Sequence, residues 1–166
     1  MKDNWDYFHN DIEYQKVLLD RLHNKFEMET AKNLSENINL HTKDNEKLNI
    51  LDIGSGPGHY YSTLKRILKS KLSSYRGLDL LESHVNAGNK YFENNPNVFF
   101  EQRDICQNSQ ISDDYNCLIS ANTIPHIPSI YSLLKSINKS KLKFIFFRML
   151  IGTETVIIKK IIGNLE

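Results

Sequence analysis

The sequence has little glycine, proline or cysteine, and it contains no long apolar run. Its 166 residues include seven glycines, four prolines and two cysteines. The cysteines, Cys106 and Cys117, are separated by ten residues and show no CxxC or Cys/His ligand spacing, so we interpret them as buried reduced thiols and expect no metal site. The longest apolar run, FIFF, is too short to cross a bilayer, and the polar start MKDNWDYFHN is unlike a signal peptide. These absences predict a soluble cytoplasmic protein without a membrane span.

The chain also lacks an excess of charge of either sign. Its 21 basic and 20 acidic residues are scattered along the chain, so nothing indicates a polyanionic partner such as nucleic acid. The densest basic stretch, LKSINKSKLK at 134–143, contains lysine but no arginine, and we interpret it as a solvated helix end and loop. A chain of this length corresponds to about one domain.

Short apolar runs alternate with amphipathic segments from residue 48 onward. This alternation is typical of βαβ units in an α/β fold with a parallel sheet. The runs are apolar nearly throughout, as expected for strands that helices cover on both faces. The expected strands are 48–53, 74–80, 97–102, 115–120 and 143–150. The expected helices between them are 60–70, 83–95 and 129–140.

The first 47 residues follow a different pattern. They are expected to form two helices, at 7–26 and 28–38, followed by a polar linker at 41–47. So short a segment cannot bury an independent core. We therefore expect a helical cap or appendage over residues 1–47, beside an α/β domain over residues 48–166.

Three of the seven glycines stand close together in LDIGSGPG, directly after the first expected strand. Glycines at a strand-to-helix junction let the backbone turn sharply and let a ligand approach the amides at the helix N-terminus. Two classes of cofactor site use such a junction. The dinucleotide fingerprint GxGxxG requires a third glycine where this chain has His59, and the pattern present is instead GxGxG after Asp52.

An acidic residue followed by GxGxG resembles the first motif of the class I S-adenosylmethionine-dependent methyltransferases. Three further stretches match this family in the expected order: GLDLLESH, EQRDICQ and ISANTIPHIP. The resemblance covers roughly residues 45 to 150. It implies S-adenosyl-L-methionine as the cofactor, and a doubly wound, mostly parallel, Rossmann-like α/β sheet.

The resemblance also implies roles for individual residues. Asp79 would bind the ribose hydroxyls, because a carboxylate accepts two charge-assisted hydrogen bonds from a cis-diol. Asp104 would contact the adenine amino group, and the backbone amide of Ile105 would meet the ring. His126 lies where a substrate would meet the methyl group and could remove a proton as a catalytic base. The expected cofactor-binding residues are Asp52, Gly54, Ser55, Gly56, Gly58, Asp79, Leu80, Asp104, Ile105 and Asn122.

Each of these positions also has a purely structural interpretation. The glycines could form a tight turn without a ligand, Asp79 could cap the helix that follows it, and Asp104 could be only a turn residue. His126, between two prolines, could cap a helix or pack under the cofactor, and Asn122 fits turn chemistry.

Arg148 and the N-terminal aromatic residues are candidates for further roles. Arg148, near the end of the fifth expected strand, could hold an acidic substrate group. The N-terminal aromatic residues could form a lid over the methyl donor or belong to the core; they are Trp5, Tyr7, Phe8 and Tyr14.

Two features depart from the family pattern. Asn116 stands where the fourth strand usually begins with aspartate, which puts a strand-start hydrogen bond in question. The family sheet has seven strands, whereas only five are expected here, so its C-terminal strands are missing. The segment 153–166 has isoleucines at helical spacing and would leave an apolar face uncovered. We expect either that the natural chain is longer or that another surface, such as a homodimer partner, covers this face.

The sequence therefore predicts an S-adenosylmethionine-dependent methyltransferase that acts on a small-molecule or lipid-like acceptor. The sulfonium is already a strong electrophile, so the protein mainly needs to align the acceptor and exclude water, and the acceptor is not readable from the sequence. One alternative is a non-catalytic methyltransferase-like binding subunit or fragment, which the early chain end motivates. Another is an NAD-type oxidoreductase.

Overall fold

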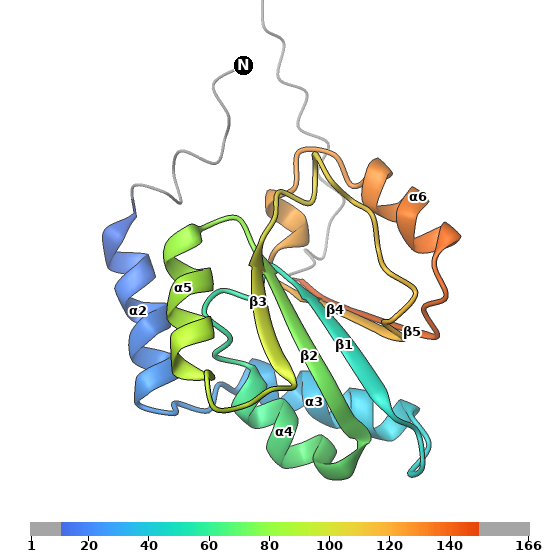
Figure 1. Ribbon diagram of the computed structural model, residues 1–166, viewed down its shortest axis with the longest axis horizontal. Helices are drawn as coiled ribbons and strands as arrows, with labels where there is room; N and C mark the ends of the chain where they lie inside the picture. The colour runs from blue at the N-terminus through green and yellow to red at the C-terminus, as the bar shows by residue number, and fades with distance from the viewer. Residues whose placement is uncertain (1–10, 150–166) are drawn as a thin grey trace, which may run out of the picture.

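A computed structural model describes residues 11–149 and places five parallel strands in one sheet (Figure 1). The strands lie in the order β3-β2-β1-β4-β5. They are β1 (Leu48–Ile53), β2 (Leu72–Asp79), β3 (Val98–Gln102), β4 (Cys117–Ala121) and β5 (Phe144–Arg148). The order reverses between β1 and β4, which is the topological switch point of a doubly wound sheet. The expected Rossmann-like α/β fold class is confirmed.

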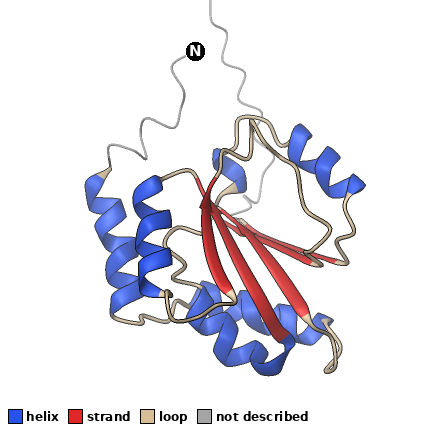
Figure 2. Ribbon diagram, in the orientation of Figure 1, coloured by secondary structure: helices blue, strands red, loops and turns tan. Residues whose placement is uncertain are grey.

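Helices cover both faces of this sheet (Figures 1 and 2). They are α2 (Ile12–His23), α3 (Glu29–His41), α4 (Tyr61–Leu68), α5 (Glu82–Tyr91) and α6 (Tyr131–Lys139), with the short 3-10 helices η1 (Lys69–Lys71) and η2 (Ile124–His126). Helices α3, α4 and α5 lie on one face, and α6 lies on the other. Of the helices that the structure describes, none combines the length and the apolar character that a membrane span requires.

The observed strands and helices follow the expected order. Strand β1 has the expected bounds, and the ends of the other strands differ from the expected ones by at most two residues. Strand β2 begins earlier than expected because Leu72 pairs with Leu48 at the start of β1. The helix expected at 153–166 lies outside the described residues, and so do the aromatic residues Trp5, Tyr7 and Phe8.

The sheet is buried between two apolar layers. On one face, Ile50 and Tyr75 belong to a core that includes residues of α3, α4 and α5. On the other face, Leu51 and Leu118 belong to a second core with Leu133 of α6. Because the central strands β1 and β4 are covered on both faces, nearly all of their positions favour apolar residues. The edge strands β3 and β5 are less covered and leave Phe99 and Ile145 exposed.

Helix α3 contributes to the first of these cores. Its Ile38 is 0% exposed and packs in the same cluster as residues of β1. The end of α3 is fixed by Lys71 of η1, whose Nζ donates to the backbone carbonyls of Asn39 and Thr42 at 3.1 and 3.0 Å. These bonds satisfy carbonyls that a helix end leaves without partners. The domain division after residue 47 stays a prediction, although α3 shares its core with the sheet.

Asn116 joins the starts of three strands. Its Oδ1 accepts a hydrogen bond from the Asn49 amide at 2.9 Å, and its Nδ2 donates to the Lys47 carbonyl at 2.6 Å. Its own carbonyl accepts from the amides of Lys143 and Phe144, at 2.9 and 3.1 Å, where β5 begins. The strand-start hydrogen bond is therefore made by asparagine, whose Nδ2 adds a donor that a carboxylate lacks.

The substitution Asn116→Ala should lower the free energy of unfolding by about 1–3 kcal/mol, because it leaves the Asn49 amide and the Lys47 carbonyl without these partners. Urea denaturation followed by circular dichroism measures this change. Asn37→Ala is the matched control, since this exposed side chain bonds only to the Asn33 carbonyl within α3. Equal stability of the two variants would contradict the assigned role of Asn116.

Candidate functional site

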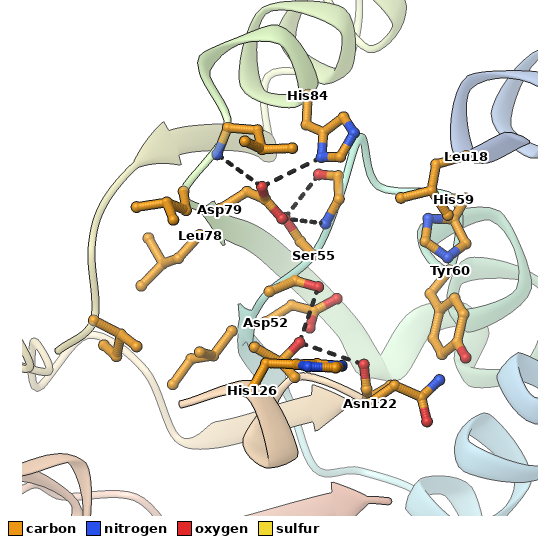
Figure 3. A pocket seen from close by; sticks show the side chains of 18 of the residues that line it. Leu18, Asp52, Ser55, His59, Tyr60, Leu78, Asp79, His84, Asn122 and His126 are labelled. Carbon is orange, nitrogen blue, oxygen red and sulfur yellow. Dashed lines mark hydrogen bonds and ion pairs between the residues drawn. The ribbon is translucent and has the colours of Figure 1, made fainter. Parts of the chain in front are cut away.

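A cavity of about 180 Å³ lies at the carboxyl ends of the strands, beside the switch point (Figure 3). Open α/β sheets bind their ligands at this place. The cavity is lined by most of the residues expected to bind a cofactor: Asp52, Gly54, Ser55, Gly56, Asp79, Leu80, Asp104, Ile105 and Asn122. The expected catalytic residue His126 lines it as well. Of the expected set, only Gly58 is not part of the lining.

Hydrogen bonds to β2 fix the glycine loop. The amides of Gly54 and Ser55 donate to the Leu78 carbonyl at 2.8 and 3.0 Å. The amide of Gly56 donates to Asp79 Oδ2 at 2.7 Å. Gly56 has a φ of +55°, in the left-handed region that favours glycine. The loop therefore presents its backbone to the cavity, with the Gly56 amide turned toward a carboxylate.

Gly58 meets the core below the loop instead of the cavity. Its φ is +86°, and a Cβ at this position would overlap the ring of Phe100. Phe100 is 1% exposed, and the same ring fills the space beside Gly77 and Gly88. The structure thus gives a packing reason for this glycine, and its expected contact with a cofactor stays a prediction.

Asp79 ends β2 and links the glycine loop to the start of α5 (Figure 3). Its Oδ1 accepts from the Leu81 amide at 3.0 Å and lies 3.3 Å from His84 Nδ1, while its Oδ2 accepts from Gly56. The N-cap position of α5 is Leu81, so Asp79 is not the N-cap residue of that helix. A carboxylate has about four lone-pair positions, which leaves capacity for a donor from a ligand.

Asp52 lies at the end of β1 and is 3% exposed. The hydroxyl of Tyr75 donates to its Oδ2 at 2.6 Å. Burial raises the pKa of the Asp52 carboxyl to about 7; the bond from Tyr75 lowers this pKa and the charge of Asp79 raises it. Burial likewise holds the pKa of Tyr75 well above its usual value. A carboxyl with such a pKa, on the wall of a cavity, is typical of a functional site.

Asp104 closes a turn after β3. Its Oδ1 accepts from the Cys106 amide at 2.8 Å, and its Oδ2 accepts from the side-chain amide of Gln107 at 2.9 Å. The turn interpretation of Asp104 therefore has structural support. The same turn presents Asp104 and Ile105 to the cavity, so the two interpretations are compatible.

The segment after β4 brings Asn122 and His126 to the cavity (Figure 3). Asn122 has a φ of +61°, a conformation that asparagine tolerates better than most residues. Its amide donates to the Arg148 carbonyl at 2.8 Å, and its side-chain oxygen accepts from the Arg148 guanidinium. Arg148 is not part of the cavity lining, so the structure does not bring it to the site. His126 ends η2 and is exposed.

A second wall of the cavity comes from the N-terminal helices and the start of α4. The residues of this wall were not among those predicted for the site; they are Leu18, Arg21, Met28, His59 and Tyr60. Figure 3 labels Leu18, His59 and Tyr60 among them. Tyr14 also lines the cavity, and it is the one member of the N-terminal aromatic set that falls within residues 11–149. Tyr14, Leu18 and Arg21 recur at helical spacing, and this shared face is the signal that could have identified the wall.

His59 takes the place of the third dinucleotide glycine. Its ring packs edge-on against Tyr60, with 4.9 Å between the centroids. Its Nδ1 is buried and has no hydrogen-bond partner in the part of the chain that the structure describes. Burial lowers the pKa of His59 to about 4, and the positive charge of Arg21 acts in the same direction. The ring is therefore neutral near pH 7.

The switch point, the glycine loop and the carboxylates at the strand ends form an arrangement that is typical of cofactor-binding sites in Rossmann-like folds. Within the described residues, no group of three or more His, Cys, Asp or Glu side chains is placed to hold a metal ion. A model of the methyltransferase domain family matches residues 50–140. The chain belongs to this family. No curated protein matches the sequence.

Solved structures share the fold at low sequence identity. A candidate methyltransferase from Haloferax volcanii, solved with the Trm112 methyltransferase activator, is 20% identical with a TM-score of 0.60, over 87% of this chain and 59% of that one. An S-adenosylmethionine-dependent methyltransferase from Mesorhizobium loti is 17% identical with a TM-score of 0.54, over 67% and 50%. The [4+2]-cyclase SpnF is 14% identical with a TM-score of 0.55, over 68% and 41%.

These likenesses show the fold alone. The chain spans 41% to 59% of the length of these three structures. One of them is described as a cyclase, so the function has to be argued from the site itself.

The depressed pKa of His59 predicts a loss of stability in acid. Above the unfolded-state pKa of 6.5, His59 is neutral in both states and no stability is lost. As the pH falls from 6.5 to about 4, the unfolded chain takes up a proton that the folded protein does not. The resulting loss of stability amounts to about 3 kcal/mol. His59→Gln keeps a polar side chain but cannot be protonated. Its free energy of unfolding, measured in urea between about pH 4 and about pH 7.5, should therefore fall less steeply than that of the wild type. If the free energies of unfolding of the two proteins fall equally steeply with decreasing pH, His59 does not have a lowered pKa.

Gly58→Ala should destabilise the protein by about 2–4 kcal/mol, because it adds backbone strain and a contact with the Phe100 ring. In a Phe100→Leu background, the same substitution should have a smaller effect, since the aromatic ring is gone and mainly the backbone strain remains. Urea unfolding of the four proteins of this double-mutant cycle measures the coupling. Additive effects would show that Phe100 is not the obstacle.

Proposed function

We propose that this protein binds S-adenosyl-L-methionine in the cavity and transfers its methyl group to a small-molecule acceptor. The observation that carries the proposal is that Asp79 and the Gly56 amide meet at the switch point, in a cavity that Asp52 and Asp104 also line. When bound, this cofactor supplies an activated methyl group. The protein then has to orient the acceptor and keep water away.

The described residues fit the parts of this cofactor. Asp79 has unused lone pairs for ribose hydroxyls. Asp104 and Ile105 offer a carboxylate beside a buried apolar side chain, which suits the polar edge and the flat face of an adenine. Asp52 is a buried carboxylate on the cavity wall, where a positively charged group would compensate for its lost hydration.

The wall opposite the strand ends is proposed to receive the acceptor. Leu18 and Met28 provide apolar surface, and the ring of Tyr60 is 5% exposed. Such a surface excludes water from the reacting groups. This apolar lining and the balanced charge of the chain suit a small molecule, or the end of a lipid-like one, better than a nucleic acid strand, which requires a basic surface.

His126 is proposed as the residue that takes a proton from the acceptor. It lines the cavity from η2 and is exposed, so a proton accepted by its ring can pass to solvent. This role applies to an oxygen or nitrogen acceptor that carries a proton.

Calorimetry with S-adenosylhomocysteine tests the proposed binding. Asp79→Asn should raise the Kd by about 10- to 100-fold, because it removes the charge that strengthens the hydrogen bonds to the ribose. Asp113→Asn is the matched control: it removes a carboxylate that is ion-paired with Lys141 at the surface and should leave the Kd unchanged. Folded wild-type protein that binds neither this ligand nor S-adenosylmethionine would reject the proposed function.

A crystal structure with S-adenosylhomocysteine tests the positions. The ribose is expected against Asp79 and the adenine beside Asp104 and Ile105. A ligand bound elsewhere would reject these residue assignments even if the affinity were high.

A further inference from the structure

Asp52 is buried without a cationic partner in the described part of the chain. Its carboxylate is 3% exposed and accepts a hydrogen bond from the Tyr75 hydroxyl. Between residues 11 and 149, no lysine, arginine or histidine forms an ion pair with it. Asp79, by contrast, accepts from two backbone amides and pairs with His84. Asp52 is therefore a buried acid that lacks a cation, placed on the wall of a cavity.

The elements packed around Asp52 supply no counter-charge. Strand β2 contributes the neutral Tyr75 and the acidic Asp79, and β4 contributes the thiol of Cys117. Burial and the charge of Asp52 raise the pKa of Cys117 to about 12, so the thiol is neutral as well. The other charged or titratable residues on the cavity wall form no ion pair with Asp52 in the described part of the chain; they include Arg21, His59, His84, Arg103, Asp104 and His126.

The protonation of Asp52 is consequently sensitive to what fills the cavity. A buried carboxylate without a cation is disfavoured relative to its neutral acid. With a pKa of about 7, the carboxyl carries a proton in about half of the molecules at pH 7. A positive charge arriving next to it would favour the anion and displace that proton.

We propose that Asp52, held by Tyr75, is a charge-selective contact that loses a proton when a cationic ligand enters the cavity. The inference rests on the proposed function, in which the ligand carries a sulfonium and an α-ammonium group. The proton leaves the Asp52 carboxyl for solvent as the ligand's charge takes its place, and no covalent bond of the ligand changes.

Tyr75 is the positioning residue of this pair. Its hydroxyl donates to Asp52 Oδ2 at 2.6 Å, which stabilises the anion and orients the carboxylate. Tyr75 is 1% exposed and does not line the cavity, so it acts only through Asp52.

The proposed contact has a consequence for turnover. Methyl transfer removes the sulfonium charge, so the product has one positive group fewer than the cofactor. If Asp52 interacts with the sulfonium, its carboxyl regains its proton when the product forms. The site then binds the product less tightly than the cofactor.

Calorimetry in buffers with different ionisation enthalpies counts the protons released on binding. S-adenosylmethionine should release about half a proton at pH 7, more at pH 6 and almost none above pH 8, and its Kd should rise toward tenfold per pH unit below pH 7. Methylthioadenosine, which has neither positive group, should release none. S-adenosylhomocysteine separates the two sources: release equal to that of S-adenosylmethionine assigns the effect to the ammonium, and its absence assigns it to the sulfonium.

Three variants distinguish this role from a structural one. Asp52→Asn should abolish the proton release and the pH dependence of the Kd. Tyr75→Phe should weaken binding of S-adenosylmethionine about fivefold at pH 7 and recover at about pH 9, because loss of the hydrogen bond favours the protonated acid. Tyr61→Phe is the matched control: this ring packs 5.2 Å from that of Tyr75, but its hydroxyl bonds to Asn95 away from the cavity. It should leave the proton count unchanged.

Carbon-13 NMR of the aspartate carboxyls adds a test that needs no ligand. One carboxyl of the unliganded protein should titrate near pH 7, and its signal should be missing from Asp52→Asn. If Asp52 is already ionised at pH 5, the inference is overturned, whether or not any ligand binds. If S-adenosylmethionine binds at pH 6 to 7 without proton release, the inference is overturned while the proposed function stands.

Discussion

The parallel pairing of β1 with β2 determines where the polar groups of the cavity lie. In this register Asp52 stands opposite Gly77, and β2 ends two residues later at Asp79. The loop that leaves β1 can therefore bond to the end of β2 through its first amides. A shift of one residue would move Asp52 to the opposite face of the sheet, away from Tyr75, since successive side chains alternate between faces. The arrangement of the site thus depends on the same backbone hydrogen bonds that pair the strands of the sheet.

The two carboxylates at the ends of these strands differ in their surroundings. Asp79 is surrounded by donors that belong to the loop and to α5, so its position is fixed by the fold. Asp52 has a hydroxyl as its donor and is buried against apolar strands. A neutral partner stabilises a buried charge less than a cation does. The two residues therefore differ in one cavity: Asp79 organises the backbone, and Asp52 is the residue that we propose responds to the charge of a ligand.

The sequence predicted the fold and most of the residues that line the cavity at the strand ends. Strands covered on both faces are apolar throughout, and β1 could be bounded because the glycine loop follows it directly. What escaped prediction depends on contacts between distant segments. In the sequence, Tyr75 looks like an ordinary core residue. Only the pairing of β1 with β2 shows that its hydroxyl bonds to Asp52. The cavity wall from α2 was missed because its residues also fit an amphipathic helix that only packs. The packing role of Gly58 escaped prediction because its partner Phe100 lies 42 positions along the chain, a separation that no local pattern reveals.

The contact between Gly58 and Phe100 affects what a glycine at position 58 indicates when related sequences are compared. A descendant of this protein that had stopped binding any cofactor would still need a glycine at position 58, because the ring below it would still occupy the space. A glycine at position 58 therefore indicates an intact core whether or not a cofactor is bound. Asp52 is a different case, since a neutral residue could accept the hydrogen bond from Tyr75 without the cost of burying a charge. If Asp52 contacts a cationic ligand as proposed, an acid at position 52 would distinguish binding proteins from non-binding ones among diverged copies of this chain better than a glycine at position 58.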